Sequence, residues 1–326
     1  MRHAAGVLAL AGLALAVVLF ARSDVGALAA LLVAAGPGLL LASLFHVVPM
    51  IANAHAWQLL LPVPQRPDLR TMTRATWIRE SVNGLLPVAR IGGEIVAYRI
   101  VRSQVERRSD AAASLIADMT LSVLSQAGFA LFGLSLLFAN HQRSVATREL
   151  LMGVAVMIAF GGGFLLAQRR GALVRVFNRL FAGRLAIAHW GSLRFEEALR
   201  AVYSRHRDIA ACAAWQLAGW VLGSGEIWIA LHFLGRPRSA FDAMILEALI
   251  QAVSSAAFMV PAALGVQEGA FVLVGAALGI DATTALALAT ARRLRDVVVF
   301  FPGLLAWQRA ETRMREARST GGARQR

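Results

Sequence analysis

The chain has 326 residues, of which 58% are apolar and only 16% are charged, a charged fraction below the ~25% of soluble domains. Its net charge is +14 and all 33 basic residues are arginine, which excludes lysine-dependent phosphate loops and lysine Schiff-base chemistry. The single cysteine, Cys212, excludes an internal disulfide and a cysteine-rich metal site. Long uncharged runs such as residues 151–160 predict an all-α polytopic membrane protein.

Six full spans are predicted in chain order. Residues 4–20 are interpreted as an uncleaved anchor, because this run of 17 residues is longer than the ~7–15 of a signal-peptide core. Residues 25–61 are too long for one span, so the sequence Gly36-Pro37-Gly38 is expected to separate an interfacial segment from a span near 39–61. The other four spans are predicted at 111–139, 150–168, 209–234 and 282–307.

Residues 76–101 form an apolar region that is broken. Asn83 and Pro87 interrupt it, and its charged residues include Arg90 and Glu94. Irregular, charged backbone at bilayer depth is tolerated only inside protein or beside a water-filled cavity. We therefore expect a re-entrant hairpin here, buried among other helices.

Residues 243–280 repeat this layout. Glu268 follows Pro261 by seven residues, as Glu94 follows Pro87. A second re-entrant hairpin is therefore expected. The residues expected to break the two hairpins are Pro87, Gly92, Gly93, Pro261, Gly265 and Gly269.

The correspondence extends beyond the hairpins. Asp118 lies 31 residues after Pro87, and Arg292 lies 31 residues after Pro261. We predict a repeat whose halves, about 1–139 and 150–308, each contain two spans, a hairpin and a third span. An odd number of crossings would invert the second half, and inverted repeats with broken helices at corresponding positions indicate the central site of a transporter.

The arginines predict the orientation. With both termini cytoplasmic, 25 of the 33 arginines fall on the inner side, where they would meet anionic phospholipid headgroups. Nucleic-acid binding is not expected. We predict a single membrane domain over 1–308 and a basic cytoplasmic tail over 309–326. Residues 169–207 are predicted to be an amphipathic insert on the inner leaflet, with a basic solvated loop as the alternative.

A charge at bilayer depth costs roughly 2.5–3.5 kcal/mol, so such residues pair, face a wet cavity or serve function. We expect Asp118 and Arg292 to form an ion pair that joins the halves, and Arg293 to pair with Asp296 on one helix face. Neither a metal site nor a cofactor is expected. The candidate substrate-binding residues are Asn83, Arg90, Glu94, Asp118, Glu226, Glu268, Arg292 and Arg295.

Two stretches carry a family resemblance. Residues 83–94, with Asn83, Pro87, Gly92, Gly93 and Glu94, and residues 260–269, with Pro261, Gly265, Glu268 and Gly269, resemble the membrane region of lysylphosphatidylglycerol synthases. Residues 291–308 resemble the hopanoid-biosynthesis-associated branch more particularly.

The resemblance implies a multi-pass bacterial inner-membrane protein that moves a lipid, expected to be a hopanoid or a related lipid. A soluble aminoacyl-transfer domain is not expected, so the protein is interpreted as a transporter and not an enzyme. The alternative is an intramembrane enzyme or assembly factor in lipid synthesis. Further partners that we expect are a second copy of the chain or lipid-biosynthesis proteins.

Overall fold

The computed structural model describes residues 13–22, 24–64, 66–86, 92–140, 193–256, 260 and 263–323. Every regular element within these ranges is a helix, in agreement with the predicted all-α class. Four features of the sequence analysis lie outside the described residues: Pro87, Arg90, Pro261 and the predicted span at 150–168. Most of the predicted amphipathic insert lies outside them too.

The N-terminal part contains a helix over Leu13–Ala21, then α2 (Val25–Ala35), α3 (Pro37–Phe45) and α4 (Val47–Leu59). The break between α2 and α3 falls at Gly36, which has a φ of +44°, a conformation that favours glycine. Pro37 opens α3, where its missing N–H is no loss. The predicted separation of two segments at this point is confirmed.

The next three helices are α5 (Leu69–Leu85), α6 (Gly92–Val101) and α7 (Arg108–Asn140). Asp68 begins α5 by accepting a hydrogen bond from the backbone N–H of Thr71. Hydrogen bonds from Thr71 hold the pKa of Asp68 below its ordinary value.

The second part contains α10 (Leu193–Ser204), α11 (His206–Phe233), α12 (Ala240–Ala256), α13 (Val266–Ala277), α14 (Ala282–Arg295), the π-helical turn η2 (Asp296–Phe300) and α15 (Phe301–Ala323). Helix α10 is amphipathic: it buries Phe195, Ala198 and Val202 and exposes Arg194 and Arg200. The predicted helix over 282–307 is present, with η2 as an irregular turn within it.

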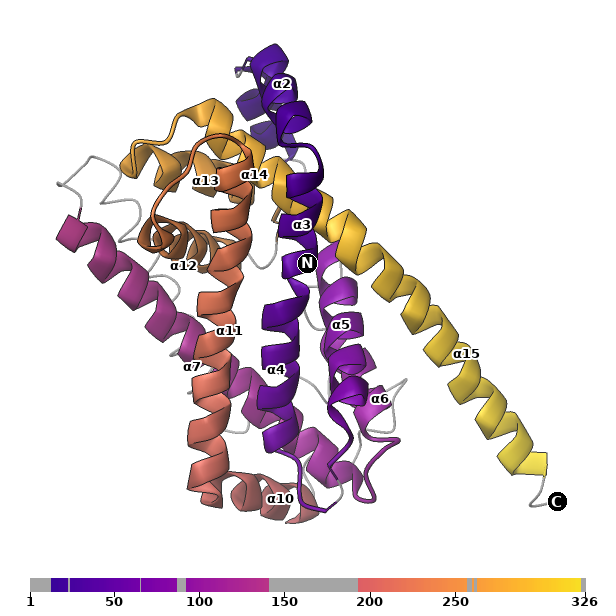
Figure 1. The fold of residues 1–326 in the computed structure, drawn as a ribbon. Helices are drawn as coiled ribbons and strands as arrows, with labels where there is room; N and C mark the ends of the chain where they lie inside the picture. Colours follow the sequence, from indigo (N-terminus) through magenta and orange to yellow (C-terminus); the bar gives the residue numbers. More distant parts are fainter. Residues whose placement is uncertain are drawn as a thin grey trace.

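Two hairpins lie at opposite ends of the molecule (Figure 1). Helices α5 and α6 pack together toward the end that holds α10, and α12 and α13 pack together toward the end that holds α2. Between them α4 and α11 run side by side in opposite directions. Helix α7 packs against α12, while η2 and α15 pack against α5. Each hairpin is thus covered by the helix that follows the other hairpin.

Small residues allow the helices to approach closely. A Cβ atom added to Gly225 of α11 would lie 2.6 Å from the ring of Phe45, and one added to Gly133 of α7 would lie 2.5 Å from the Cβ of Ala248. Small residues at helix contacts are typical of packing in membranes, where van der Waals contact replaces the hydrophobic driving force.

Two described helices are long and apolar enough to cross a bilayer, Pro37–Leu59 and Arg108–Ala139. The helix over Leu13–Ala21 and α2 would add a third span if they are counted as one span, with a bend of 93° between them. Two of the predicted spans, near 39–61 and at 111–139, therefore coincide with helices of suitable length and composition.

Candidate functional site

Buried charges gather in two clusters. The first cluster joins Arg79 of α5, Glu94 of α6 and Asp118 of α7. Arg79 Nη1 lies 2.7 Å from Asp118 Oδ2 and 3.7 Å from Glu94 Oε2. Gln216 of α11 donates from Nε2 to Asp118 Oδ1 at 2.8 Å. Asp118 is fully buried, so these partners stabilise a charge that has no access to water.

Asn83 links the two helices of the first hairpin, α5 and α6. Its Oδ1 accepts a 2.9 Å hydrogen bond from the backbone N–H of Gly93, and its Nδ2 lies 3.4 Å from Glu94 Oε1. A Cβ atom on Gly93 would lie 2.2 Å from the carbonyl oxygen of Arg79. Glycine at this position therefore lets the start of α6 meet α5 and places Glu94 beside Arg79.

The second cluster draws on six elements, α5, α11, α12, α13, α14 and η2, and on the turn between α3 and α4. Arg292 of α14 forms an ion pair with Glu247 of α12, and its Nε lies 3.8 Å from Glu226 Oε1 of α11. Arg295 Nη1 lies 3.2 Å from Glu226 Oε2, and Arg295 Nη2 lies 2.6 Å from Asp296 Oδ1. The members of the second cluster are His46, Glu80, Glu226, Glu247, Glu268, Arg292, Arg293, Arg295 and Asp296.

Glu268 caps the start of α13 in the second hairpin and links it to α14. Its Oε2 accepts a 2.7 Å hydrogen bond from the backbone N–H of Gly265, which has a φ of +76° at the start of α13. Its Oε1 lies 2.8 Å from Arg293 Nη2. Both hairpins therefore place a glutamate in the first turn of the second helix, Glu94 in α6 and Glu268 in α13, and both glutamates face an arginine.

His46 connects the two halves of the molecule. It lies at the turn between α3 and α4, where Pro49 has no backbone N–H to donate to the carbonyl of Phe45. Its Nδ1 is 3.2 Å from Glu226 Oε2 of α11, and its Nε2 is 3.2 Å from Glu80 Oε2 of α5.

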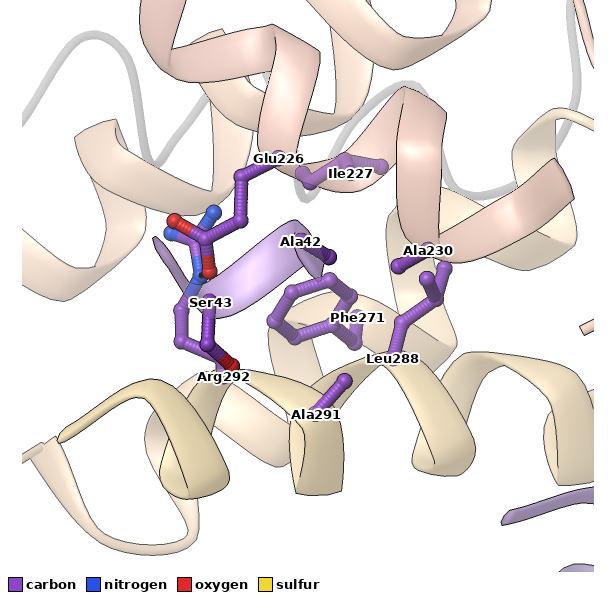
Figure 2. Close-up of a pocket in the computed structure, with 9 residues that line it drawn as sticks. All are labelled: Ala42, Ser43, Glu226, Ile227, Ala230, Phe271, Leu288, Ala291 and Arg292. Atoms are coloured by element: carbon purple, nitrogen blue, oxygen red, sulfur yellow. Dashed lines mark ion pairs between the residues drawn. The ribbon is translucent and has the colours of Figure 1, made fainter. Parts of the chain in front are cut away.

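A small cavity adjoins the second cluster (Figure 2). Arg292, Glu226 and Ser43 form its polar side, and apolar side chains such as Phe271 and Leu288 line the rest. The cavity is about the size of one water molecule. Arg292 Nη1 has no hydrogen-bond partner within the described residues, so this guanidinium keeps donor capacity at the cavity.

The predicted ion pair between Asp118 and Arg292 is wrong. Asp118 pairs with Arg79 and Arg292 pairs with Glu247. Each charge is satisfied by the first helix of the hairpin in its own half, so neither has to reach across the molecule. The predicted pair of Arg293 with Asp296 is confirmed, with Nη1 and Oδ2 3.6 Å apart.

The predicted roles of three glycines as hairpin breakers are also wrong. Gly269 lies inside α13 and does not break the second hairpin, because the helix has already begun at Val266. Gly92 and Gly93 are the first residues of α6, so the first break precedes them. Gly265 is in the break itself, as predicted.

Seven of the eight candidate substrate-binding residues are described. The first cluster contains Glu94 and Asp118, with Asn83 in contact with Glu94, and the second contains Glu226, Glu268, Arg292 and Arg295. The structure places them in two groups that adjoin at Arg79 and Glu80 of α5.

Sequence reasoning missed Arg79, Gln216 and the role of His46. Arg79 could have been found, because it and Glu80 are adjacent charges in a partly apolar helical stretch, where charges need partners. Gln216 gives no such signal, because its side chain carries no charge. Among the described residues, no group of three or more His, Cys, Asp or Glu side chains could hold a metal ion.

A family model described as the lysylphosphatidylglycerol synthase TM region matches residues 5–303. The chain belongs to this family. The match includes both hairpins and both charge clusters, and together with the apolar helices it identifies the chain as a lipid-related membrane protein. Neither a search of curated proteins nor a search of solved structures gives a significant match.

Proposed function

We propose that the chain is a lipid translocase of the bacterial inner membrane, and that its substrate is a hopanoid or a related lipid with a polar headgroup. The observation that carries the proposal is the pair of broken hairpins, which lie at opposite ends of the molecule and each hold a buried glutamate in the first turn after the break. Broken helices at corresponding positions of two inverted halves are typical of transporters.

The helix packing supports an inverted repeat. Helices α4 and α11 lie side by side and antiparallel, and each is followed by a hairpin. Helix α7 then covers α12, as α15 and η2 cover α5. In this proposal the first half, about 1–139, includes α3 to α7, and the second half, about 150–308, includes α11 to α14 and the start of α15. The two halves could then open alternately to each side of the bilayer around the charge clusters.

The ends of the molecule support the predicted orientation. The start of α5, helix α10 and the far end of α15 lie toward the same end in Figure 1, and these segments carry several arginines, among them Arg70, Arg74, Arg194 and Arg200. An excess of arginine marks the cytoplasmic side. The C-terminus would then be cytoplasmic, and the α12–α13 hairpin would enter from the outer side.

The second cluster offers the chemistry for a polar headgroup. Among the described residues, Arg292 Nη1 has no hydrogen-bond partner, and Arg292 lines a small cavity with an apolar wall. Hydroxyl or phosphate oxygens of a lipid can accept hydrogen bonds from such a donor. The proposed topology has six spans. The first, at residues 4–20, lies partly outside the described residues, and the fourth, at 150–168, lies wholly outside them.

Deletion of the gene tests this proposal against the enzyme alternative. The inner and outer membranes of the deletion strain are separated, and the lipids of each are quantified by mass spectrometry. We expect finished lipid to accumulate in the inner membrane, with its precursors at wild-type levels. Accumulation of a precursor instead would contradict the translocase and support an intramembrane enzyme or assembly factor.

A further inference from the structure

His46 makes hydrogen-bond contacts that require an additional proton. A neutral imidazole has one N–H donor and one nitrogen that carries a lone pair. Both ring nitrogens of His46 lie 3.2 Å from a carboxylate oxygen, one from Glu226 and one from Glu80. With both glutamates ionised, a neutral His46 would therefore point one lone pair at a carboxylate. An added proton, on the imidazole or on Glu80, removes this repulsion.

Glu80 depends on this proton more than Glu226 does. Glu226 also contacts two arginines, Arg295 at 3.2 Å and Arg292 at 3.8 Å. Within the part of the chain that the structure describes, the one salt bridge of Glu80 is with His46, and Arg79 and Arg295 act on its carboxylate only at longer range. Loss of the proton would thus leave Glu80 and the imidazole in repulsive contact, while Glu226 keeps its arginines.

The surrounding charges favour an added proton. Glu80 from α5 and Glu226 from α11 face His46 and favour the proton, whereas Arg295 from α14 opposes it, and the Phe300 ring of η2 packs edge-on against the imidazole. Arg292 and Asp296 act through their contacts with Glu226 and Arg295. The second cluster as a whole has five carboxylates, Glu80, Glu226, Glu247, Glu268 and Asp296, and three arginines, Arg292, Arg293 and Arg295. A proton at His46 reduces this excess of negative charge.

The location of His46 connects the proton to movement. The residue lies at the break between α3 and α4, and it joins α5 of the first hairpin to α11, which precedes the second hairpin. A bond that forms only with a proton would hold these two helices together in one state and release them in another. Such a bond is a bistable element that a proton can bias.

We propose that His46, Glu80 and Glu226 form a proton-binding site, and that uptake and release of this proton couple a proton gradient to lipid movement. The coupling part rests on the proposed translocase function. The proton-binding part does not, so the two are tested separately.

The first experiment measures proton binding without transport. The thermal unfolding midpoint of the purified full chain in detergent is recorded from about pH 5 to about pH 9. A proton held by the folded site stabilises the protein at low pH, and this stabilisation is lost as pH rises. We expect the wild-type midpoint to fall by at least about 3 °C in one step.

Two variants identify the source of that step. Glu80→Gln replaces the carboxylate with an amide that can donate to the lone pair of His46, so the bridge no longer needs the proton. We expect this variant to fold and to lose the step. His46→Gln should lose it as well. The matched controls, Glu106→Gln and His232→Gln, change exposed residues and should keep it. A step that persists in Glu80→Gln and His46→Gln would overturn the proton site.

The second experiment tests the coupling. Vesicles of phosphatidylcholine and phosphatidylglycerol contain the protein and a polyhydroxylated hopanoid, and an imposed pH gradient is reversed between samples. Wild-type protein should change its rate of lipid movement with the gradient, and Glu80→Gln should move lipid at a rate that ignores it. Equal gradient dependence in both would reject the coupling. If neither moves lipid while the unfolding step depends on Glu80, the proton site stands and the translocase function fails.

Discussion

The guanidinium of Arg79 lies 2.7 Å from the carboxylate of Asp118, and this ion pair joins the first hairpin to the long helix α7. In the second half an ion pair between Arg292 and Glu247 joins the second hairpin to α14. The two pairs connect corresponding elements with the signs of their charges exchanged. Each half therefore holds its own hairpin through a buried pair.

Double-mutant cycles can separate these pairs. Breaking a buried ion pair costs about 3–5 kcal/mol because one charge is left without a partner. Asp118→Asn or Arg79→Gln alone should lower the unfolding midpoint in detergent, and the double variant should recover part of the loss. The losses from Asp118→Asn and Arg292→Gln should simply add. Coupling between Asp118 and Arg292, with none between Asp118 and Arg79, would contradict the pairing.

Two glycines, each next to a hairpin glutamate, should respond differently to substitution by alanine. A Cβ atom on Gly93 would lie 2.2 Å from the carbonyl oxygen of Arg79, whereas the nearest atoms to one on Gly269 are 3.9 Å away, on Leu15 and Leu19. Gly93→Ala should destabilise the protein by about 1–3 kcal/mol, the usual cost of overpacking. Gly269→Ala should be within about 1 kcal/mol of wild type, since it gains helix propensity. Equal losses in thermal unfolding would show that the first hairpin has no such close approach.

The sequence predicted the helical class, the break at Gly36 and the two hairpins because each depends on local signals. Gly36 and Pro37 interrupt an apolar run, and Pro87 and Pro261 are each followed seven residues later by a glutamate. These features act through the backbone of a few adjacent residues.

The partners of the buried charges were harder to predict. Asp118 has Arg79 as its partner, 39 residues away, and Gln216, 98 residues away. Which of several arginines meets a carboxylate depends on how the helices are rotated and how far each hairpin enters. Spacing from a proline gives neither quantity, so the predicted pair of Asp118 and Arg292 was wrong even though both residues are buried.

Glu94 and Glu268 should both be needed for transport. Glutamine keeps an oxygen that can accept the hydrogen bond from Gly265 or contact Asn83, so Glu94→Gln and Glu268→Gln should accumulate to near wild-type amounts. We expect either variant to lower the rate of lipid movement at least about tenfold, equivalent to roughly 1.4 kcal/mol. Lipid distribution between the membranes of a complemented deletion strain measures this, with Glu106→Gln as the control. Normal distribution with both variants would show that the carboxylates are structural.

The orientation can be tested with single cysteines in a Cys212→Ser background. Ser103 and Ser239 are both exposed; Ser103 follows α6 and Ser239 precedes α12, toward opposite ends of the molecule (Figure 1). Cysteine at Ser239 should react with an impermeant thiol reagent in intact spheroplasts. Cysteine at Ser103, or at Ala323 in the C-terminal segment, should react only after the cells are opened. The reverse pattern would invert the proposed topology.

The rate at which lipid crosses a vesicle membrane tests the translocase most directly. Purified protein is reconstituted into vesicles with a polyhydroxylated hopanoid, and cyclodextrin added outside extracts the outer-leaflet pool over time. A fluorescent phosphatidylglycerol in parallel vesicles distinguishes a hopanoid substrate from a phospholipid. We expect wild-type protein, and not Glu268→Gln, to make the inner-leaflet hopanoid extractable. If wild-type protein accelerates the movement of neither lipid, this chain is not a translocase for these lipids.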